Sequence, residues 1–171
     1  MSHDKNIVHI AGHIVYIVLY GSMILSALFF YNWANLEILL YLGWVILAFG
    51  ICFLLLASQS RKKGYVTEGN GARKETLVES GMYALIRHPE FLSHLLIIFA
   101  LILIAQHWLS IVIGAILILL LYIAMTEEEK RNIVKFGEAY KNYMQKVPRI
   151  NLLAGIIKQM RYKKEARKSS A

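Results

Sequence analysis

Three long segments of this chain contain no charged residue, and they limit its possible folds more than any other feature. They cover residues 6–36, 38–60 and 91–126. A helix needs about 20 apolar residues to cross a hydrocarbon core of about 30 Å. The first two segments are therefore predicted to hold one span each. The third would be about 54 Å long as one helix, so we predict a hairpin of two spans with a break near Gln106, His107 and Trp108.

The composition agrees with a membrane environment. Hydrophobic residues make up 57% of the chain and charged residues 18%, against about 45–50% and 25% in soluble domains. A soluble helical protein of this composition would have too little polar surface to cover its core. We therefore predict an all-α, polytopic membrane protein with four transmembrane helices and a C-terminal amphipathic helix, forming a single domain over residues 1–171.

The basic residues predict the topology. The loop 61–90 and the segment after Glu127 carry most of the Lys and Arg, whereas the connections at 31–35 and 106–110 carry none. Since positive charge is retained on the cytoplasmic side, we expect an integral protein of the cell membrane with both termini in the cytoplasm and no cleaved signal peptide. The net charge of +8 is explained by this rule, and no motif suggests a nucleic-acid partner.

The predicted organisation follows the charge pattern, with membrane lipids as neighbours throughout. The expected parts are two N-terminal spans (1–60), a cytoplasmic loop (61–90), the helical hairpin (91–126), an acidic pair with an amphipathic helix (127–150) and a basic tail (151–171). The tail either contacts anionic headgroups or is a solvated end. The spans contain no Asp, Glu, Lys or Arg, which argues against a proton-coupled transporter or an ion channel.

Two polar clusters flank the predicted hairpin. Arg87, His88 and Pro89 precede the third span, and Glu128 and Glu129 follow the fourth. Because a short outer turn makes those spans antiparallel neighbours, we expect the two clusters to face each other at the cytoplasmic side. An interfacial salt-bridge cluster that only anchors the spans is the alternative.

Such a pairing suits a zwitterionic ligand. Pro89 is suited to the first turn of a helix, which leaves backbone N–H groups near His88 and Glu90 for an anion such as a carboxylate. Glu128 or Glu129 then receives an ammonium group or ribose hydroxyls. The amino-acid end of S-adenosylmethionine has this character.

An apolar stripe follows the acidic pair and predicts an amphipathic helix. It consists of Ile133, Phe136, Tyr140, Tyr143, Met144 and Val147, at steps of mostly three or four residues. The helix would act as an interfacial anchor or as a lid over the site. No metal site is expected, and Cys52 is interpreted as an inert thiol within the second span.

The ordered motifs of the C-terminal half resemble the isoprenylcysteine carboxyl methyltransferase family and its phospholipid methyltransferase relatives. The motifs are Leu77-Val78, Gly81, Tyr83, Ile86-Arg87-His88-Pro89, Glu128-Glu129, Phe136-Gly137, Tyr140, Tyr143 and Val147-Pro148-Arg149. The resemblance covers residues 77–150. It implies a methyltransferase that uses S-adenosylmethionine and acts on a lipophilic, isoprenoid- or lipid-like substrate entering from the bilayer. Carboxyl O-methylation of an isoprenylcysteine-type group is one reaction that the resemblance suggests.

The resemblance also implies roles for individual residues. His88, Pro89, Glu128 and Glu129 would bind the cofactor. Tyr83, Tyr140 and Tyr143 would wall its pocket. Arg87 would face the reacting group of the substrate, and Arg87 and Glu129 would be the catalytic residues.

Two positions depart from the family pattern. Phe91 stands where the family usually has tyrosine, and Ser93 stands where it often has glycine. Two other functions stay open at this point: a steroid-reductase-like membrane reductase that uses NADPH, and a non-enzymatic four-span binding or transport protein.

Overall fold

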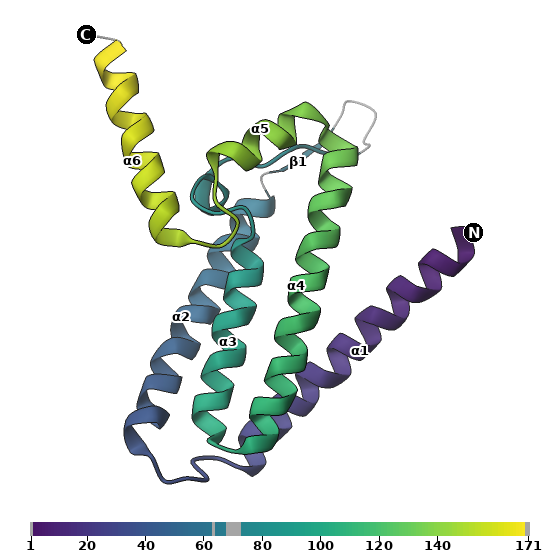
Figure 1. The fold of residues 1–171 in the computed structure, drawn as a ribbon, viewed down its shortest axis with the longest axis vertical. Coiled ribbons are helices and arrows are strands. Elements are labelled where there is room, and N and C mark those ends of the chain that lie inside the picture. The colour runs from purple at the N-terminus through teal and green to yellow at the C-terminus, as the bar shows by residue number, and fades with distance from the viewer. Residues whose placement is uncertain (1, 63, 68–72, 170–171) are drawn as a thin grey trace. The chain divides into compact units, whose positions relative to one another are not determined.

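A computed structural model of the chain describes residues 2–62, 64–67 and 73–169, and it describes side chains from residue 12 onward except 13, 65–67, 73–75, 162–163 and 165–169 (Figure 1). The helices are α1 (Ser2–Phe29), α2 (Glu37–Lys62), the 3₁₀ helix η1 (Gly81–Ala84), α3 (Pro89–Ala105), α4 (Trp108–Phe136), α5 (Glu138–Lys146) and α6 (Leu152–Ser169). The predicted helical class is confirmed. A short antiparallel ribbon of β1 (Tyr65–Thr67) and β2 (Arg73–Glu75), with Tyr65 opposite Glu75, was not anticipated.

The predicted break in the third uncharged segment is confirmed. α3 ends at Ala105, and Gln106 adopts a left-handed conformation with φ of 55°. The Gln106 amide then donates to the Leu36 carbonyl and accepts from the Leu36 N–H, both at 3.0 Å. The side chain thus satisfies both backbone hydrogen-bonding groups of Leu36. The polar residue within an apolar run therefore both ends α3 and joins it to the loop before α2.

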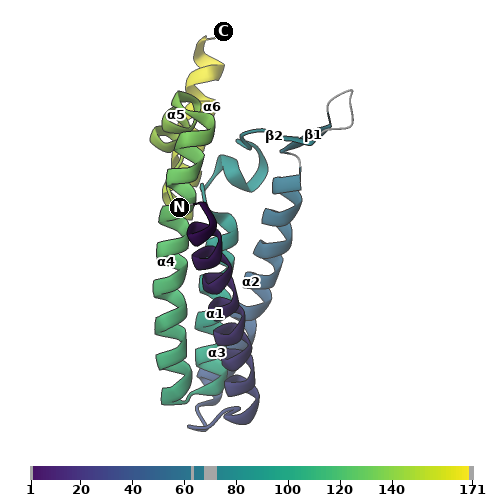
Figure 2. The same ribbon diagram turned by 90° about the vertical axis from the view of Figure 1, so that its right-hand side faces the viewer.

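The chain divides into two compact units, and the single domain over residues 1–171 stays a prediction. The first contains residues 1–50 and 94–124. Its helices approach each other closely at glycines, which have no side chain. A Cβ at Gly43 or Gly50 of α2 would lie 2.9 Å from Ile104 or Ile97 of α3. At Gly114 of α4 it would likewise meet α3 side chains. Within this unit α2 and α4 thus pack on α3, which lies between them in Figure 2.

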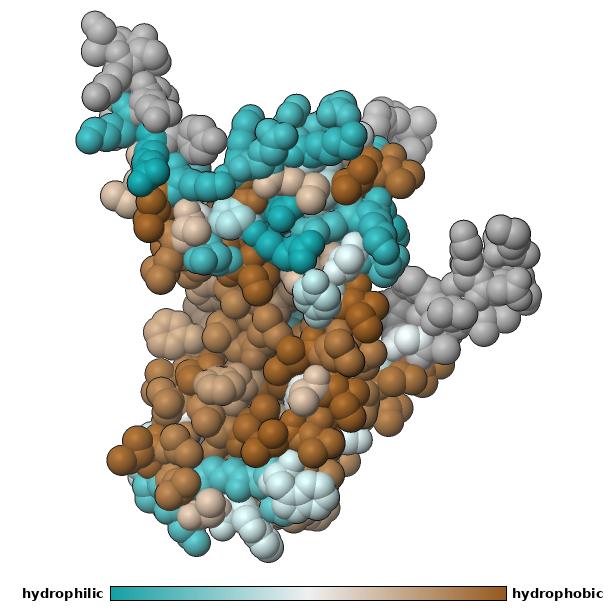
Figure 3. All heavy atoms as spheres, in the orientation of Figure 1, coloured by the Kyte–Doolittle hydropathy of each residue, from teal (hydrophilic) through white to brown (hydrophobic). Residues whose placement is uncertain are grey.

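Hydrophobic side chains cover most of the face of this helical unit that is seen in Figure 3, and many large hydrophobic residues of its helices are exposed. Two helices, α2 and α4, are long and apolar enough to cross a membrane. Only 17% and 28% of their most apolar windows is buried. Soluble proteins rarely expose apolar surface on this scale, so lipid suits these helices better than water. The four-span arrangement stays a prediction, because α3 has 17 residues and the apolar part of α1 is Ile14–Phe29.

The second unit contains residues 51–93 and 125–171, and all residues of the predicted site lie within it. Its helices depart from the predicted amphipathic helix, which is interrupted. α4 continues to Phe136, and Gly137 then adopts φ of 58° and ψ of −131° before α5 begins. This conformation is open essentially to glycine alone. The glycine therefore separates Ile133 and Phe136, on α4, from Tyr140 and Tyr143, on α5.

Candidate active site

A single buried carboxylate, that of Glu129 on α4, organises the polar centre of the second unit. Its Oε1 lies 3.1 Å from His88 Nε2 and 3.3 Å from Arg87 Nη1. Arg149 donates through Nε to Oε1 at 3.1 Å and through Nη2 to Oε2. The second of these bonds is also an ion pair, so the guanidinium grips the carboxylate in a bidentate fashion.

Backbone hydrogen bonds hold Arg87, His88 and Arg149 near Glu129. Arg87 N–H donates to the Pro148 carbonyl at 2.9 Å, and His88 N–H donates to the Arg149 carbonyl at 3.1 Å. Two segments far apart in sequence therefore run side by side immediately before α3. The prediction that the N–H group of His88 is left for an anion is thus corrected, since Arg149 takes it.

The helix start predicted at Pro89 is confirmed. Its first turn is closed by Ser93, whose buried hydroxyl donates to the Pro89 carbonyl at 2.8 Å. Phe91, which replaces the tyrosine of the family pattern, packs edge-on against the His88 ring with centroids 5.4 Å apart. The imidazole is therefore fixed by a ring on one side and by Glu129 on the other.

His88 is held as a neutral imidazole. Burial lowers its pKa, the positive charges of Arg87 and Arg149 lower it further, and the hydrogen bond and charge of Glu129 oppose this only in part. A carboxylate can only accept, so the ring must donate through Nε2. Its Nδ1 then carries a lone pair, and this buried atom has no hydrogen-bond partner among the described residues.

Arg87 supplies the complementary groups. Its side chain is 9% exposed. Its Nε and Nη1 are buried and make no hydrogen bond among the residues that the structure describes, although Nη1 lies within ion-pairing distance of Glu129 Oε1. Buried polar atoms are nearly always paired, so atoms left over in this way point to a missing ligand. The centre thus offers two donors on Arg87 and one acceptor on His88 that make no hydrogen bond, next to the same carboxylate.

The net charge of the centre is positive. Arg87 and Arg149 each carry one positive charge, Glu129 one negative charge, and His88 none. One positive charge is therefore in excess. The buried site favours a ligand group that brings a negative charge.

The predicted tyrosines lie together in the second unit. Tyr140 and Tyr143 are buried on α5 with ring centroids 5.8 Å apart, and with Val147 they form a hydrophobic core cluster, called the tyrosine core below. The Tyr143 hydroxyl donates to the backbone carbonyl of Tyr83 at 2.7 Å. Burial raises the pKa of both core phenols, so they stay protonated donors.

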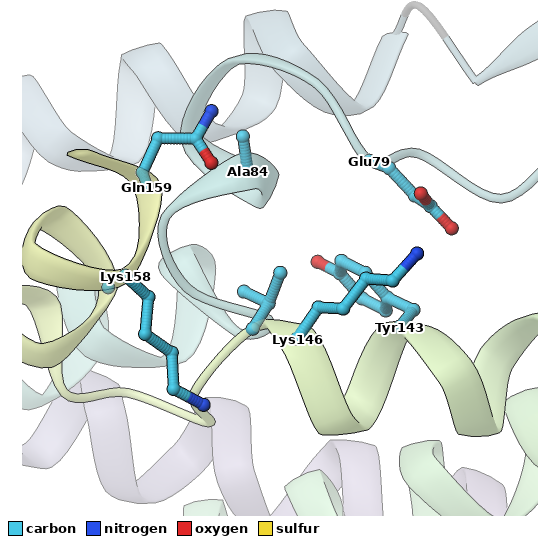
Figure 4. A pocket seen from close by; sticks show the side chains of 8 residues that line it. Glu79, Ala84, Tyr143, Lys146, Lys158 and Gln159 are labelled. Carbon is cyan, nitrogen blue, oxygen red and sulfur yellow. The ribbon is translucent and has the colours of Figure 1, made fainter. Parts of the chain in front are cut away.

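A cavity of about 240 Å³ lies beside this tyrosine core. It is lined by Glu79, Ala84, Tyr143, Lys146, Val147, Gly155, Lys158 and Gln159. Figure 4 shows the side chains of Lys146 and Glu79 pointing toward one another across it. Tyr143 is one of the residues that line this cavity, whereas Tyr140 and Tyr83 are not among them. The role of the three tyrosines as walls of a cofactor pocket stays a prediction.

The acidic pair is divided between two environments. Glu129 is buried with the bases, whereas Glu128 is half-buried and its charge acts on the Tyr140 phenol. Successive residues on a helix point about 100° apart, which accounts for the division. Among the described residues, no three His, Cys, Asp or Glu side chains are grouped as ligands of a metal would be.

Arg149 is the site residue that the sequence interpretation did not assign a role. Arg149 belongs to the Val147-Pro148-Arg149 motif. The signal that could have identified it is a positive charge in the segment that follows the acidic pair. Its pairing with Glu129 could not be deduced from spacing, because it depends on the backbone contact between 148–149 and 87–88.

Comparison with known proteins places the chain in a family. No curated protein gives a significant match. A family profile described as "Protein of unknown function (DUF1295)" matches residues 3–147, which includes Arg87, His88 and Glu129 but ends before Arg149. The match covers most of the chain, and the chain therefore belongs to the DUF1295 family.

Proposed function

We propose that this protein is an integral membrane methyltransferase that uses S-adenosylmethionine and acts on a lipophilic substrate. One observation carries the proposal. Two donors on Arg87 and one acceptor on His88 make no hydrogen bond and adjoin the same buried carboxylate, with which one of the two donors is ion-paired. A ligand that satisfies all three must present both an acceptor, such as a carboxylate, and a donor, such as an ammonium group.

The amino-acid end of S-adenosylmethionine meets that requirement. Its carboxylate would receive the N–H groups of Arg87 and offset the excess positive charge of the centre. Its ammonium group would donate to His88 Nδ1. Arg149 and His88 already donate to both carboxylate oxygens of Glu129. In this proposal Glu129 therefore positions Arg87, His88 and Arg149 more than it contacts the ligand.

The chemistry of transfer needs few catalytic groups. When bound, the cofactor supplies a methyl group activated by a sulfonium. The protein has to orient the acceptor and keep water away, and orientation of this kind accounts for roughly 7–11 kcal/mol of barrier lowering in favourable cases. The buried tyrosine core, with its protonated phenols, provides an apolar wall.

The acceptor is proposed to be ionised when it arrives, as the carboxylate of an isoprenylcysteine-type group would be. A carboxylate needs no base, whereas a hydroxyl, amine or thiol would require one. The neutral imidazole of His88 is the nearest candidate base, and ligand binding at Nδ1 would occupy it. In the four-span arrangement that we propose, with site and termini in the cytoplasm, the apolar part of the substrate enters from lipid.

Calorimetry with S-adenosylhomocysteine on detergent-purified protein tests the proposal. His88→Gln retains a donor for Glu129 but removes the acceptor at Nδ1, and Arg87→Gln removes the guanidinium donors. We expect each to weaken binding by at least about tenfold, the equivalent of one lost charge-assisted hydrogen bond. Arg61→Gln, which alters an exposed ion pair with Glu90, should bind as the wild type does.

Two outcomes would overturn the proposal. The first is no heat of binding with the folded wild-type protein, as a non-enzymatic binding or transport protein predicts. The second is binding of NADPH that depends on the same residues, which would identify the reductase instead. A labelled-methyl assay with membrane lipid extracts then identifies the class of acceptor.

A further inference from the structure

Among its described residues, α6 contacts the rest of the second unit through one side. Gly155 lies against the backbone of Leu85, and a Cβ at this position would overlap the Leu85 carbonyl. Gln159, one turn later, lines the cavity with Gly155. The side of α6 that carries Gly155 and Gln159 therefore faces its own protein.

Another side of the same helix is apolar and exposed. Leu153, Ile156, Ile157 and Met160 recur at helical spacing, and their exposed fractions are 74%, 38%, 52% and 67%. Such an i, i+3, i+4, i+7 pattern normally marks the buried face of a helix. Here it covers two turns of the face that the protein itself does not bury.

Basic residues continue this apolar stripe toward the C-terminus. Arg161 follows Ile157 by four residues, and Lys164 follows Met160 by four. Both are exposed. Residues 158–168 contain six Lys and Arg and a single acid, Glu165. Apolar and cationic groups therefore occupy the same side of α6 in succession.

We propose that α6 lies on an anionic membrane surface. Leu153, Ile156, Ile157 and Met160 would enter the boundary between headgroups and acyl chains, with Arg161 and Lys164 contacting anionic headgroups. Apolar burial and attraction to negative lipid add in such helices. A second copy of the chain is a less suitable partner, because the basic residues of its α6 would repel Arg161 and Lys164. The proposal does not depend on methyl transfer.

Spin-label accessibility tests the docking on the full chain. A nitroxide is attached to Ile157→Cys in a Cys52→Ser background, and the protein is placed in nanodiscs of phosphatidylcholine alone or of an equal mixture with phosphatidylglycerol. In the mixture we expect the label to collide with oxygen and to be shielded from a water-soluble nickel chelate. In phosphatidylcholine alone it should be more accessible to the chelate. A label at Asn142→Cys on α5 should be accessible in both.

Charge-removal variants separate lipid charge from general burial. Arg161→Gln with Lys164→Gln should lower the ratio of shielded to accessible label in the mixture by roughly tenfold or more, as expected for two charges at a membrane surface. Lys130→Gln with Lys141→Gln removes the same charge from α4 and α5 and should leave the ratio unchanged.

Three results would overturn the proposal. They are equal exposure to the chelate in both lipids, equal shielding that the Arg161 and Lys164 changes do not alter, and shielding that rises with the number of copies per disc instead of with lipid charge. The last would identify another copy as the partner. None of these readouts uses S-adenosylhomocysteine, so failure here is distinct from failure of the proposed enzymatic function.

Discussion

Glu129 shows how one side chain can determine the state of three others. It fixes the Nε2–H tautomer of His88 and lies within ion-pairing distance of both Arg87 and Arg149. Removing one member of a buried charge cluster leaves its partners without compensation, and this costs more than the cluster contributes. Glu129 is therefore expected to be more sensitive to substitution than its exposed neighbours on the same helix.

Glu129→Ala should destabilise the protein by about 3–5 kcal/mol, because Arg87 would lose its counter-charge inside the unit. Thermal unfolding in detergent, followed by circular dichroism, measures the effect. Glu127→Ala is the matched control: it removes the same side chain two residues away, where the carboxylate only pairs with exposed Lys130. Equal midpoints for the two variants would contradict the role assigned to Glu129.

At the scale of elements, the sequence predicted a helix boundary correctly where a single residue determines it. Pro89 at a helix start and a polar residue in an apolar run at Gln106 each predicted a boundary that the structure has. The interruption at Gly137 was missed, because the apolar stripe continues across it with helical spacing. The contact of 87–88 with 148–149 depends on how distant segments meet, and no local pattern encodes it.

The seating of α6 is a prediction at this scale. Gly155→Ala should push α6 away from Leu85, because the new Cβ would overlap a backbone carbonyl that cannot move aside as a side chain can. Overpacking of this kind costs roughly 1–3 kcal/mol. Hydrogen exchange should show faster exchange across α6 in the variant.

Gly21→Ala provides the control for that measurement. Its Cβ would meet nothing within 4 Å, and alanine favours a helix over glycine. Exchange in α6 should be unchanged in this variant. Unchanged exchange in Gly155→Ala as well would show that the close contact with Leu85 does not hold α6 in place.

At the scale of the whole molecule, hydrophobic side chains lie outside and the polar centre lies inside a single unit. Among the described helices, α2 and α4 meet the length and hydropathy needed for a span, and charge distribution supplies the remaining argument for four. The helical class was thus predicted correctly, and two helices that could cross a membrane agree with the predicted environment. The division into two units was not predicted, since its boundaries fall within continuous helices at residues 50–51, 93–94 and 124–125.

The four-span topology predicts which loops share a side of the membrane. In a Cys52→Ser background, Ser80→Cys and Asn142→Cys should react with an impermeant maleimide only after cells are permeabilised, whereas Ala34→Cys should react in intact cells. If only α2 and α4 cross the membrane, Ser80 and Asn142 would label from opposite sides. Labelling patterns therefore distinguish the two arrangements without any assay of function.

The backbone pairing of Arg87 and His88 with Pro148 and Arg149 also sets an order of events during synthesis. Arg87 and His88 are translated about 60 residues before Pro148 and Arg149, with which they pair. Until residue 149 has been added, Glu129 lacks its bidentate clamp and Arg87 and His88 lack their backbone acceptors. The complete arrangement around Glu129 can therefore form only after residue 149 has been translated.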